Sequence, residues 1–252
     1  MSRFSLQIQK EYGLEQSLVP ENMFNYIQNF WILKLHDHEE ANLDTNYSEV
    51  GVLILSGKCI IEARDFGYPI ASSSVLPCVG SRKNVFEGLP TAIYMPTKEK
   101  FKIIAQGEVE LAICAGACEE KTQPALIQPK DIKVISVGRG NWKREVRLII
   151  GENSPSVNLI IGECLNPSGN WSGTPPHKHE NDNLPYESLH EELYYFKTKT
   201  PNGFGIQRLY SPERNIDKLI LLKNNTITFI PWGYHQIVAG PGYPLYYLFF
   251  LS

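Results

Sequence analysis

The sequence predicts an all-β protein made of two tandem β-barrels. Short runs rich in Val, Ile, Tyr and Phe alternate with clusters of Gly, Pro and Asn, which is typical of a sandwich or barrel. A histidine pair followed by a glutamate and a strand-like run occurs once in each half of the chain. The composition agrees, since 42% of the 252 residues are hydrophobic and the net charge is only −3. The near-neutral charge also argues against a nucleic-acid-binding surface.

Each expected strand has the length and the β-branched or aromatic enrichment of known strands. In the first half these segments are Val50–Leu55, Cys59–Ala63, Thr91–Met95 and Val109–Cys114. In the second half they are Val134–Val137, Val146–Ile150, Asn158–Leu165, Leu193–Lys197, Phe204–Leu209, Ile227–Pro231 and Tyr246–Leu251. Helical signals are weak, and the best of them predicts a short helix in Pro20–Phe30.

A polar stretch that contains two prolines, Glu119–Lys130, separates the halves. We therefore predict an N-terminal barrel over residues 1–118, a linker over 119–132 and a C-terminal barrel over 133–252. No apolar run reaches the roughly 20 residues that span a bilayer, and the N-terminus has no apolar signal core. The expected location is the cytoplasm, which suits five scattered cysteines that form no disulfide framework. We interpret Cys114 and Cys118 as small buried apolar residues.

Four of the six histidines form two pairs, His36/His38 and His177/His179. Residues two apart in a strand face the same side, so such a pair can hold one metal ion on a β element, whereas a helix needs a spacing of four. The first pair is followed by Glu49 but by no third histidine in its half. We therefore expect the N-terminal barrel to lack a metal and interpret its histidines as a decayed copy, in a structural role or at a dimer interface. A second metal site is the less favoured alternative.

The second half adds the remaining donors of a metal site. Glu191 or Glu192 places a carboxylate at the start of a strand, and His235 follows a tight turn after another strand. Three imidazoles and a carboxylate suit zinc, manganese, iron or nickel, with positions left for a substrate. Strand alternation puts the two glutamates on opposite faces and does not choose between them. His190, which precedes them, is expected beside the site or on the surface.

The order of these residues resembles the metal motifs of the cupins: His177-x-His179, then a glutamate, then a Pro-x-Gly-x-His turn that ends at His235. In cupins the ligand glutamate begins a strand of the form Glu-x-x-Tyr-aliphatic. Glu192-Leu-Tyr-Tyr-Phe fits this form better than a strand begun by Glu191, which favours Glu192 as the ligand. Two features depart from the general pattern, because the interval between His179 and the glutamate is long and the turn motif is shortened.

Both departures are features of one cupin family. The stretches Pro167–Phe196, Gly203–Tyr210 and Ile230–Leu248 closely resemble the 5-deoxy-glucuronate isomerases of the IolB family, which is similar to the uronate isomerase KduI. The first half agrees more loosely, through Leu53–Ala63 and Asn84–Pro96. The resemblance covers most of the chain, and its motifs are most specific in the second half.

The resemblance implies a bicupin, that is, two tandem jelly-roll β-barrels with few short helices. It implies a metal-assisted aldose–ketose isomerase that converts 5-deoxy-D-glucuronate to 5-dehydro-2-deoxy-D-gluconate through an enediol in myo-inositol catabolism. The implied metal ligands are His177, His179, Glu192 and His235. Zinc is the expected ion, because the isomerisation needs no redox chemistry, and manganese, iron and nickel are the alternatives. Exposed edges often pair between chains in bicupins, which makes a homo-oligomer an expectation.

Isomerisation also needs a base and a group that binds the substrate carboxylate. Candidates for the base or a proton relay are Glu191, Tyr194 and Tyr234. Candidates for the carboxylate group are Lys178, Arg147 and Arg208, with Arg139 and Arg144 as further arginines. Gln207 and Arg208 are neighbours in one strand and face opposite ways, so only one of them can reach the site.

Two other classes of function stay open at this point. An iron-dependent cupin dioxygenase would use two histidines and a carboxylate, although a third histidine argues against it. A non-catalytic sugar-binding cupin would bind the sugar without turnover. Oxygen uptake with bound iron would identify the first, and sugar binding without turnover the second.

Overall fold

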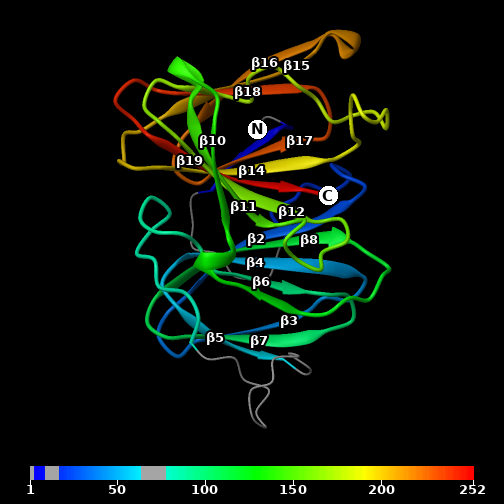
Figure 1. The fold of residues 1–252 in the computed structure, drawn as a ribbon, viewed down its shortest axis with the longest axis vertical. Coiled ribbons are helices and arrows are strands. Elements are labelled where there is room, and N and C mark those ends of the chain that lie inside the picture. Colours follow the sequence, from blue (N-terminus) through cyan, green and yellow to red (C-terminus); the bar gives the residue numbers. More distant parts are fainter. Residues whose placement is uncertain (1–2, 9–16, 64–77) are drawn as a thin grey trace. The chain divides into compact units, whose positions relative to one another are not determined.

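A computed structural model describes residues 3–8, 17–63 and 78–252 of the chain. Figure 1 shows that nearly all of its regular elements are strands. The helical elements of the described residues are short 3-10 helices at Pro129–Asp131, Gly140–Trp142 and Pro212–Arg214. This confirms the predicted all-β class with few short helices. No helix formed by the described residues has the length and apolarity to cross a membrane.

The helix expected in Pro20–Phe30 is wrong. Asn22 adopts a left-handed conformation (φ +56°), and a strand already begins at Ile27. Pro20-Glu21-Asn22 thus marks a turn that leads into a strand, a role in which these residue types are as common as at helix starts.

The described residues form two compact units. The first unit contains described parts of residues 10–132 and 149–161, together with Ser252. Its five-stranded sheet has the order β2 (Ile27–Leu35), β8 (Val109–Ala117), β4 (Ser48–Ser56), β6 (Ala92–Met95) and β9 (Ala125–Ile127). Its three-stranded sheet has the order β3 (Glu40–Asp44), β7 (Lys100–Ala105) and β5 (Cys59–Ala63). Alternate side chains of both sheets, such as Val50 and Val52 of β4 and Phe101 of β7, share one apolar core.

The second unit contains described parts of residues 1–9 with 133–148 and 162–251. Its seven-stranded sheet has the order β1 (Ser5–Gln7), β17 (Thr226–Ile230), β14 (Glu192–Thr198), β19 (Leu245–Leu251), β12 (Ile160–Asn166), β11 (Arg144–Ile150) and β10 (Lys133–Val137). Its four-stranded sheet has the order β13 (Trp171–Ser172), β18 (Tyr234–Ala239), β15 (Gly205–Ser211) and β16 (Ile216–Leu222). Strand β14 pairs in antiparallel fashion with both of its neighbours, β17 and β19.

Several segments differ from the predicted boundaries. The predicted C-terminal barrel includes residues 149–161 and Ser252, but they group with the first unit. Ser5–Gln7 pairs with β17, so the start of the chain belongs to the second unit and not to a barrel over residues 1–118. Ala125–Ile127 pairs with β6, so the expected linker supplies an edge strand to the first unit. Both strands cover an edge that would otherwise expose unpaired backbone groups.

The interior of the second unit is filled from both of its sheets. Tyr194 and Phe196 of β14 meet Leu209 of β15, Ile237 of β18 and Tyr247 of β19 in one cluster. Strand alternation therefore directs residues 192, 194 and 196 of β14, and residues 235, 237 and 239 of β18, to the same interior.

The reactivity of the cysteines tests the packing of the two cores. Cys59, Cys114, Cys118 and Cys164 are buried, whereas Cys78 is exposed. Burial raises the pKa of the Cys164 thiol to about 11 and that of Cys59 to about 12, which leaves almost no reactive thiolate at neutral pH. We expect a thiol reagent to modify one cysteine rapidly in the native protein and the other four only on unfolding. Rapid modification of a second cysteine, located by mass spectrometry, would contradict this packing.

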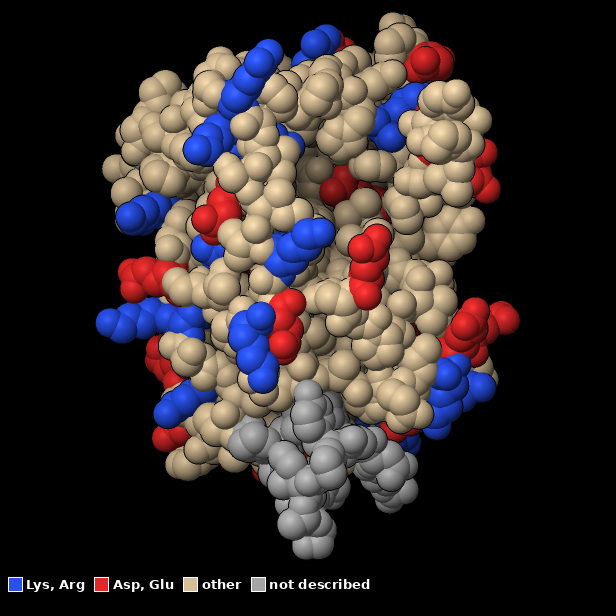
Figure 2. Space-filling view, in the orientation of Figure 1, with Lys and Arg blue, Asp and Glu red and all other residues tan. Residues whose placement is uncertain are grey.

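The charged side chains are distributed without a dominant sign. Figure 2 shows basic and acidic side chains interspersed on the visible face. This view agrees with the small net charge of −3.

Candidate metal centre

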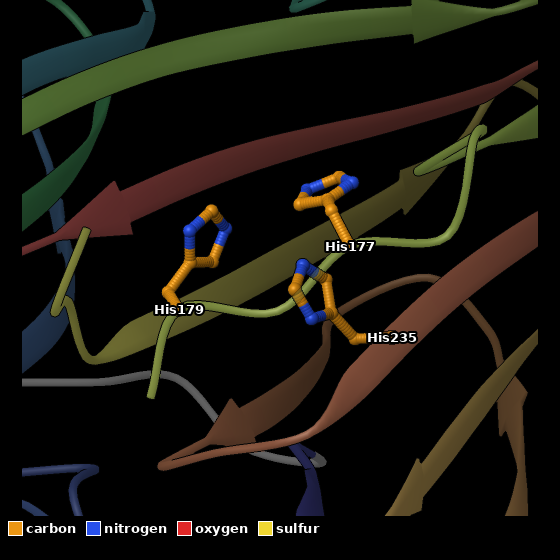
Figure 3. A group of neighbouring side chains, drawn as sticks. All are labelled: His177, His179 and His235. Atoms are coloured by element: carbon orange, nitrogen blue, oxygen red, sulfur yellow. The ribbon is translucent and has the colours of Figure 1, made fainter. Parts of the chain in front are cut away.

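Three histidines converge inside the second unit. His177 and His179 come from the segment between β13 and β14, and His235 comes from β18. One ring nitrogen of each lies within 4.8 Å of the others. The ring centroids are 5.0 Å apart for His177 and His179, and 4.9 Å and 5.3 Å from His235 respectively. Figure 3 shows the three rings gathered around a common point.

The first two histidines are held outside the named strands. The expectation that a strand carries them is wrong in this respect, because an i, i+2 pair needs a locally extended backbone but no sheet partner. The His177 Nδ1 contacts the Pro175 carbonyl oxygen at 3.2 Å, and the His190 backbone N–H donates to the His179 carbonyl oxygen at 2.9 Å. These contacts fix the segment on both sides of the pair.

A glycine turn places the third histidine. Gly233 has φ +86°, and a Cβ at this position would lie 2.8 Å from the Tyr210 carbonyl oxygen. The Gly233 carbonyl oxygen accepts a hydrogen bond from His235 Nδ1 at 2.9 Å. A carbonyl oxygen can only accept, so Nδ1 carries a proton, and this hydrogen bond directs Nε2 toward Glu192 in the interior.

Glu192 completes the cluster. Its Oε2 lies 3.0 Å from His235 Nε2 and 3.8 Å from His179 Nε2, and the side chain is almost fully buried. Neither Glu192 Oε2 nor His235 Nε2 has a partner of hydrogen-bond geometry, although the two atoms are close. A buried carboxylate oxygen and an imidazole nitrogen this close are favourable only when a positive charge lies between them, either a metal ion or a proton. Burial lowers the pKa of His235, but the neighbouring Glu192 carboxylate raises it above its usual value, so a metal ion would take the place of a proton there.

The protonation states suit a metal ion. Burial lowers the pKa of His179 to about 4, and burial and the neighbouring His235 lower the pKa of His177, so both rings are neutral at neutral pH. Burial alone would raise the pKa of Glu192, but the neighbouring His235 and His179 lower it and keep the carboxylate ionised. Neutral imidazoles and an ionised carboxylate are the forms that bind divalent metals, so the residues present fit such an ion.

The structure brings one of the three predicted catalytic residues to this cluster. Tyr194 shares the interior face of β14, and its hydroxyl interacts with the Glu192 carboxylate. Burial raises the pKa of Tyr194 far above its usual value, so its hydroxyl keeps the proton and orients Glu192. Glu191 directly precedes β14 and is buried, and Tyr234 begins β18, where strand alternation places it on the face opposite His235. Tyr234 stacks on Tyr210 with ring centroids 4.9 Å apart.

The three predicted substrate-binding residues are likewise placed elsewhere. Lys178 lies between the two histidines in sequence, and its Nζ forms an ion pair with Glu180. Arg208 faces outward and binds Asp217 through two nitrogens, at 2.9 and 2.7 Å, while Gln207 takes the interior position. Arg147 pairs with Glu145 and Glu163, each at 2.7 Å. Val146 and Cys164 face the interior. Arg147 and Glu163 are their neighbours in sequence, so the Arg147–Glu163 ion pair lies on the opposite face of the sheet.

Among the described arginines of the second unit, Arg144 is the one that faces the interior. It precedes Val146 by two residues on β11 and therefore shares the inward face. The sequence contains this signal, because Arg144, Val146 and Leu148 alternate. The signal is weak, however, since the other face of the strand also carries buried residues, Arg147 and Ile149, which hides the inward direction.

The first unit differs at the matching positions. Val50 follows Glu49 as Glu192 follows Glu191, and it belongs to the apolar core. His36 and His38 lie in an exposed turn after β2, near Glu108 (3.8 Å) and Asp37 (3.4 Å) respectively. The two histidine pairs are therefore not equivalent in structure, and a role of the first pair at an interface stays a prediction.

Solved structures with similar folds confirm the predicted bicupin. A variant of oxalate decarboxylase from Bacillus subtilis aligns with a TM-score of 0.66 at 10% identity, covering 99% of this chain and 77% of that one. A cupin 2 conserved barrel domain protein from Leptotrichia buccalis aligns with a TM-score of 0.52 at 11% identity, covering 98% and 95%. At these identities the likeness concerns the fold alone.

Relatives with higher sequence identity point to one family. An IolB-like protein from Salmonella typhimurium LT2 has a TM-score of 0.91 at 26% identity and covers 100% of this chain and 93% of its own. The 5-deoxy-glucuronate isomerases of Geobacillus kaustophilus and Geobacillus thermodenitrificans are each 35% identical, covering 94% and 98% of this chain and 84% and 89% of their own. These relatives confirm the predicted enzyme class, an isomerase. The model of the KduI/IolB family matches residues 4–252, and the chain belongs to this family.

Proposed function

We propose that this protein is an aldose–ketose isomerase that converts 5-deoxy-D-glucuronate to 5-dehydro-2-deoxy-D-gluconate, in myo-inositol catabolism in the cytoplasm. We further propose that His177, His179, Glu192 and His235 hold a divalent metal ion, with zinc as the expected ion. The relatives supply the reaction class and substrate. One observation supports the metal assignment above the others. The buried atoms Glu192 Oε2 and His235 Nε2 lie 3.0 Å apart without hydrogen-bond geometry.

The reaction moves a proton from C2 to C1 and a second proton from the C2 hydroxyl to the C1 oxygen, through an enediol. A divalent metal ion held by His177, His179, Glu192 and His235 would supply positive charge that polarises the carbonyl group and offsets the negative charge that develops during the proton transfer. The protein residues supply the geometry around it. Tyr194 holds Glu192, and the Gly233 carbonyl oxygen orients the His235 ring.

The direct test combines metal analysis with an NMR assay on 5-deoxy-D-glucuronate. We expect one equivalent of divalent metal per chain, conversion to the ketose, loss of activity on chelation and recovery on addition of zinc. Turnover by the metal-free protein would contradict the metal assignment. Sugar binding without turnover would identify a non-catalytic cupin, and oxygen uptake with bound iron would identify a dioxygenase.

A substitution of Arg208 tests whether this exposed residue takes part in substrate binding. Arg208→Ala removes an exposed side chain whose partner, Asp217, is also exposed, and exposed pairs contribute little. We expect kcat/KM to stay within about twofold of the wild type. Asp217→Ala is the matched control and should behave in the same way. If kcat/KM decreases tenfold or more in Arg208→Ala but not in Asp217→Ala, Arg208 takes part in substrate binding.

A further inference from the structure

One cation faces the interior of the C-terminal barrel near the histidines. Arg144 and Val146 share the inward face of β11, and Val146 packs against the interior cluster. The charge of Arg144 acts on His177, and also on the interior side chains of Cys164 and Tyr247. The guanidinium group therefore lies on the same side of the sheet as the proposed metal ligands.

This guanidinium group has few partners in the described part of the chain. Its Nη1 donates to the Trp142 carbonyl oxygen at 3.3 Å, whereas its Nε is buried without a hydrogen-bond partner. Other arginines differ, because Arg147, Arg208 and Arg214 each pair with a carboxylate at 2.7 Å. Arg144 is half-buried, and its buried Nε without a partner is unfavourable; arginines with such unpaired buried donors are typical of sites that bind an anion.

We propose that Arg144 binds the carboxylate of the substrate and selects sugar acids over neutral sugars; this inference rests on the proposed function. The planar guanidinium fork matches a carboxylate, and the attraction is strong in a poorly solvated interior. In 5-deoxy-D-glucuronate the carboxylate lies at the opposite end of the chain from C1 and C2. Binding one end at Arg144 and the other at the histidine cluster fixes the reacting carbons in place.

The test compares the acid with its neutral analogue, in which a hydroxymethyl group replaces the carboxylate. For Arg144→Gln we expect kcat/KM for the acid to fall roughly 100-fold, mainly through KM, because a buried charge pair is lost. The rate with the neutral analogue, the metal content and the unfolding midpoint should stay near the wild-type values. Arg144→Lys keeps the charge without the fork and should lie between the two.

Arg139→Gln is the matched control, since Arg139 is exposed in the same segment and should leave both substrates unaffected. An equal loss with the acid and the neutral analogue, or a loss of metal, would overturn the inference and assign Arg144 a structural role. If the wild type converts neither sugar, the proposed function fails and binding decides the role of Arg144. NMR titration with 5-deoxy-D-glucuronate should then show binding to the wild type and not to Arg144→Gln, and equal binding would overturn the inference.

Discussion

His177→Ala is expected to remove the bound metal ion and to lower kcat/KM roughly 1,000-fold or more, because the reaction loses the charge that stabilises the enediolate. The barrel should stay folded, since His177 lies in an exposed position of the segment before β14 and belongs to no strand. Metal content after dialysis and the NMR rate are the two measurements. If His177→Ala retains one metal equivalent and full activity, His177 is not a metal ligand.

Two further variants sharpen this result. Glu192→Gln keeps the size of the side chain and removes its charge, so we expect weaker metal binding without a cavity. His36→Ala is the matched control, because this histidine is exposed and lies in the turn after β2. It should leave metal content and turnover near the wild-type values. A large loss of turnover in His36→Ala would show that the N-terminal histidine pair takes part in function.

The cluster of proposed metal ligands could be predicted from the sequence because its signal is local. The spacing of His177 and His179 and the turn before His235 can be recognised without knowing the fold, and the strand form after Glu192 favoured it over Glu191. The structure supplies the reason for this choice: Tyr194, two residues on, is an interior residue, so Glu192 faces inward as well.

The proposed substrate-binding residue, Arg144, could not be singled out in this way, because the direction of a strand residue depends on which face of the strand is interior. Both faces of β11 carry buried residues, so alternation alone did not separate Arg144 from Arg147. The same ambiguity affected Gln207 and Arg208 in β15. Ser5–Gln7 shows a different limit, because a three-residue strand whose partner lies more than 200 residues away leaves no local pattern.

Glu49 carries the second large prediction, and it concerns stability rather than chemistry. Its side chain is fully buried and accepts hydrogen bonds from the backbone N–H groups of Val157, Asn158 and Leu159 at 2.9, 2.6 and 2.9 Å. The Tyr94 hydroxyl donates to it at 2.8 Å. The glutamate that follows the first histidine pair thus holds the segment 149–161 of its own unit, instead of binding a metal.

Glu49→Ala is expected to lower the free energy of unfolding by about 3–5 kcal/mol, because the backbone donors and the Tyr94 hydroxyl lose their acceptor in a buried place. Such a loss is a large part of the roughly 5–15 kcal/mol by which domains are stable. Glu49→Gln should cost less, since its amide keeps one acceptor oxygen, although its NH₂ group opposes the donors. Chemical denaturation measures both, with Glu108→Ala as the exposed, neutral control. A change in Glu49→Ala as small as that of the control would show that the segment 149–161 is held by its apolar contacts, such as Leu159 and Ile161, rather than by this carboxylate.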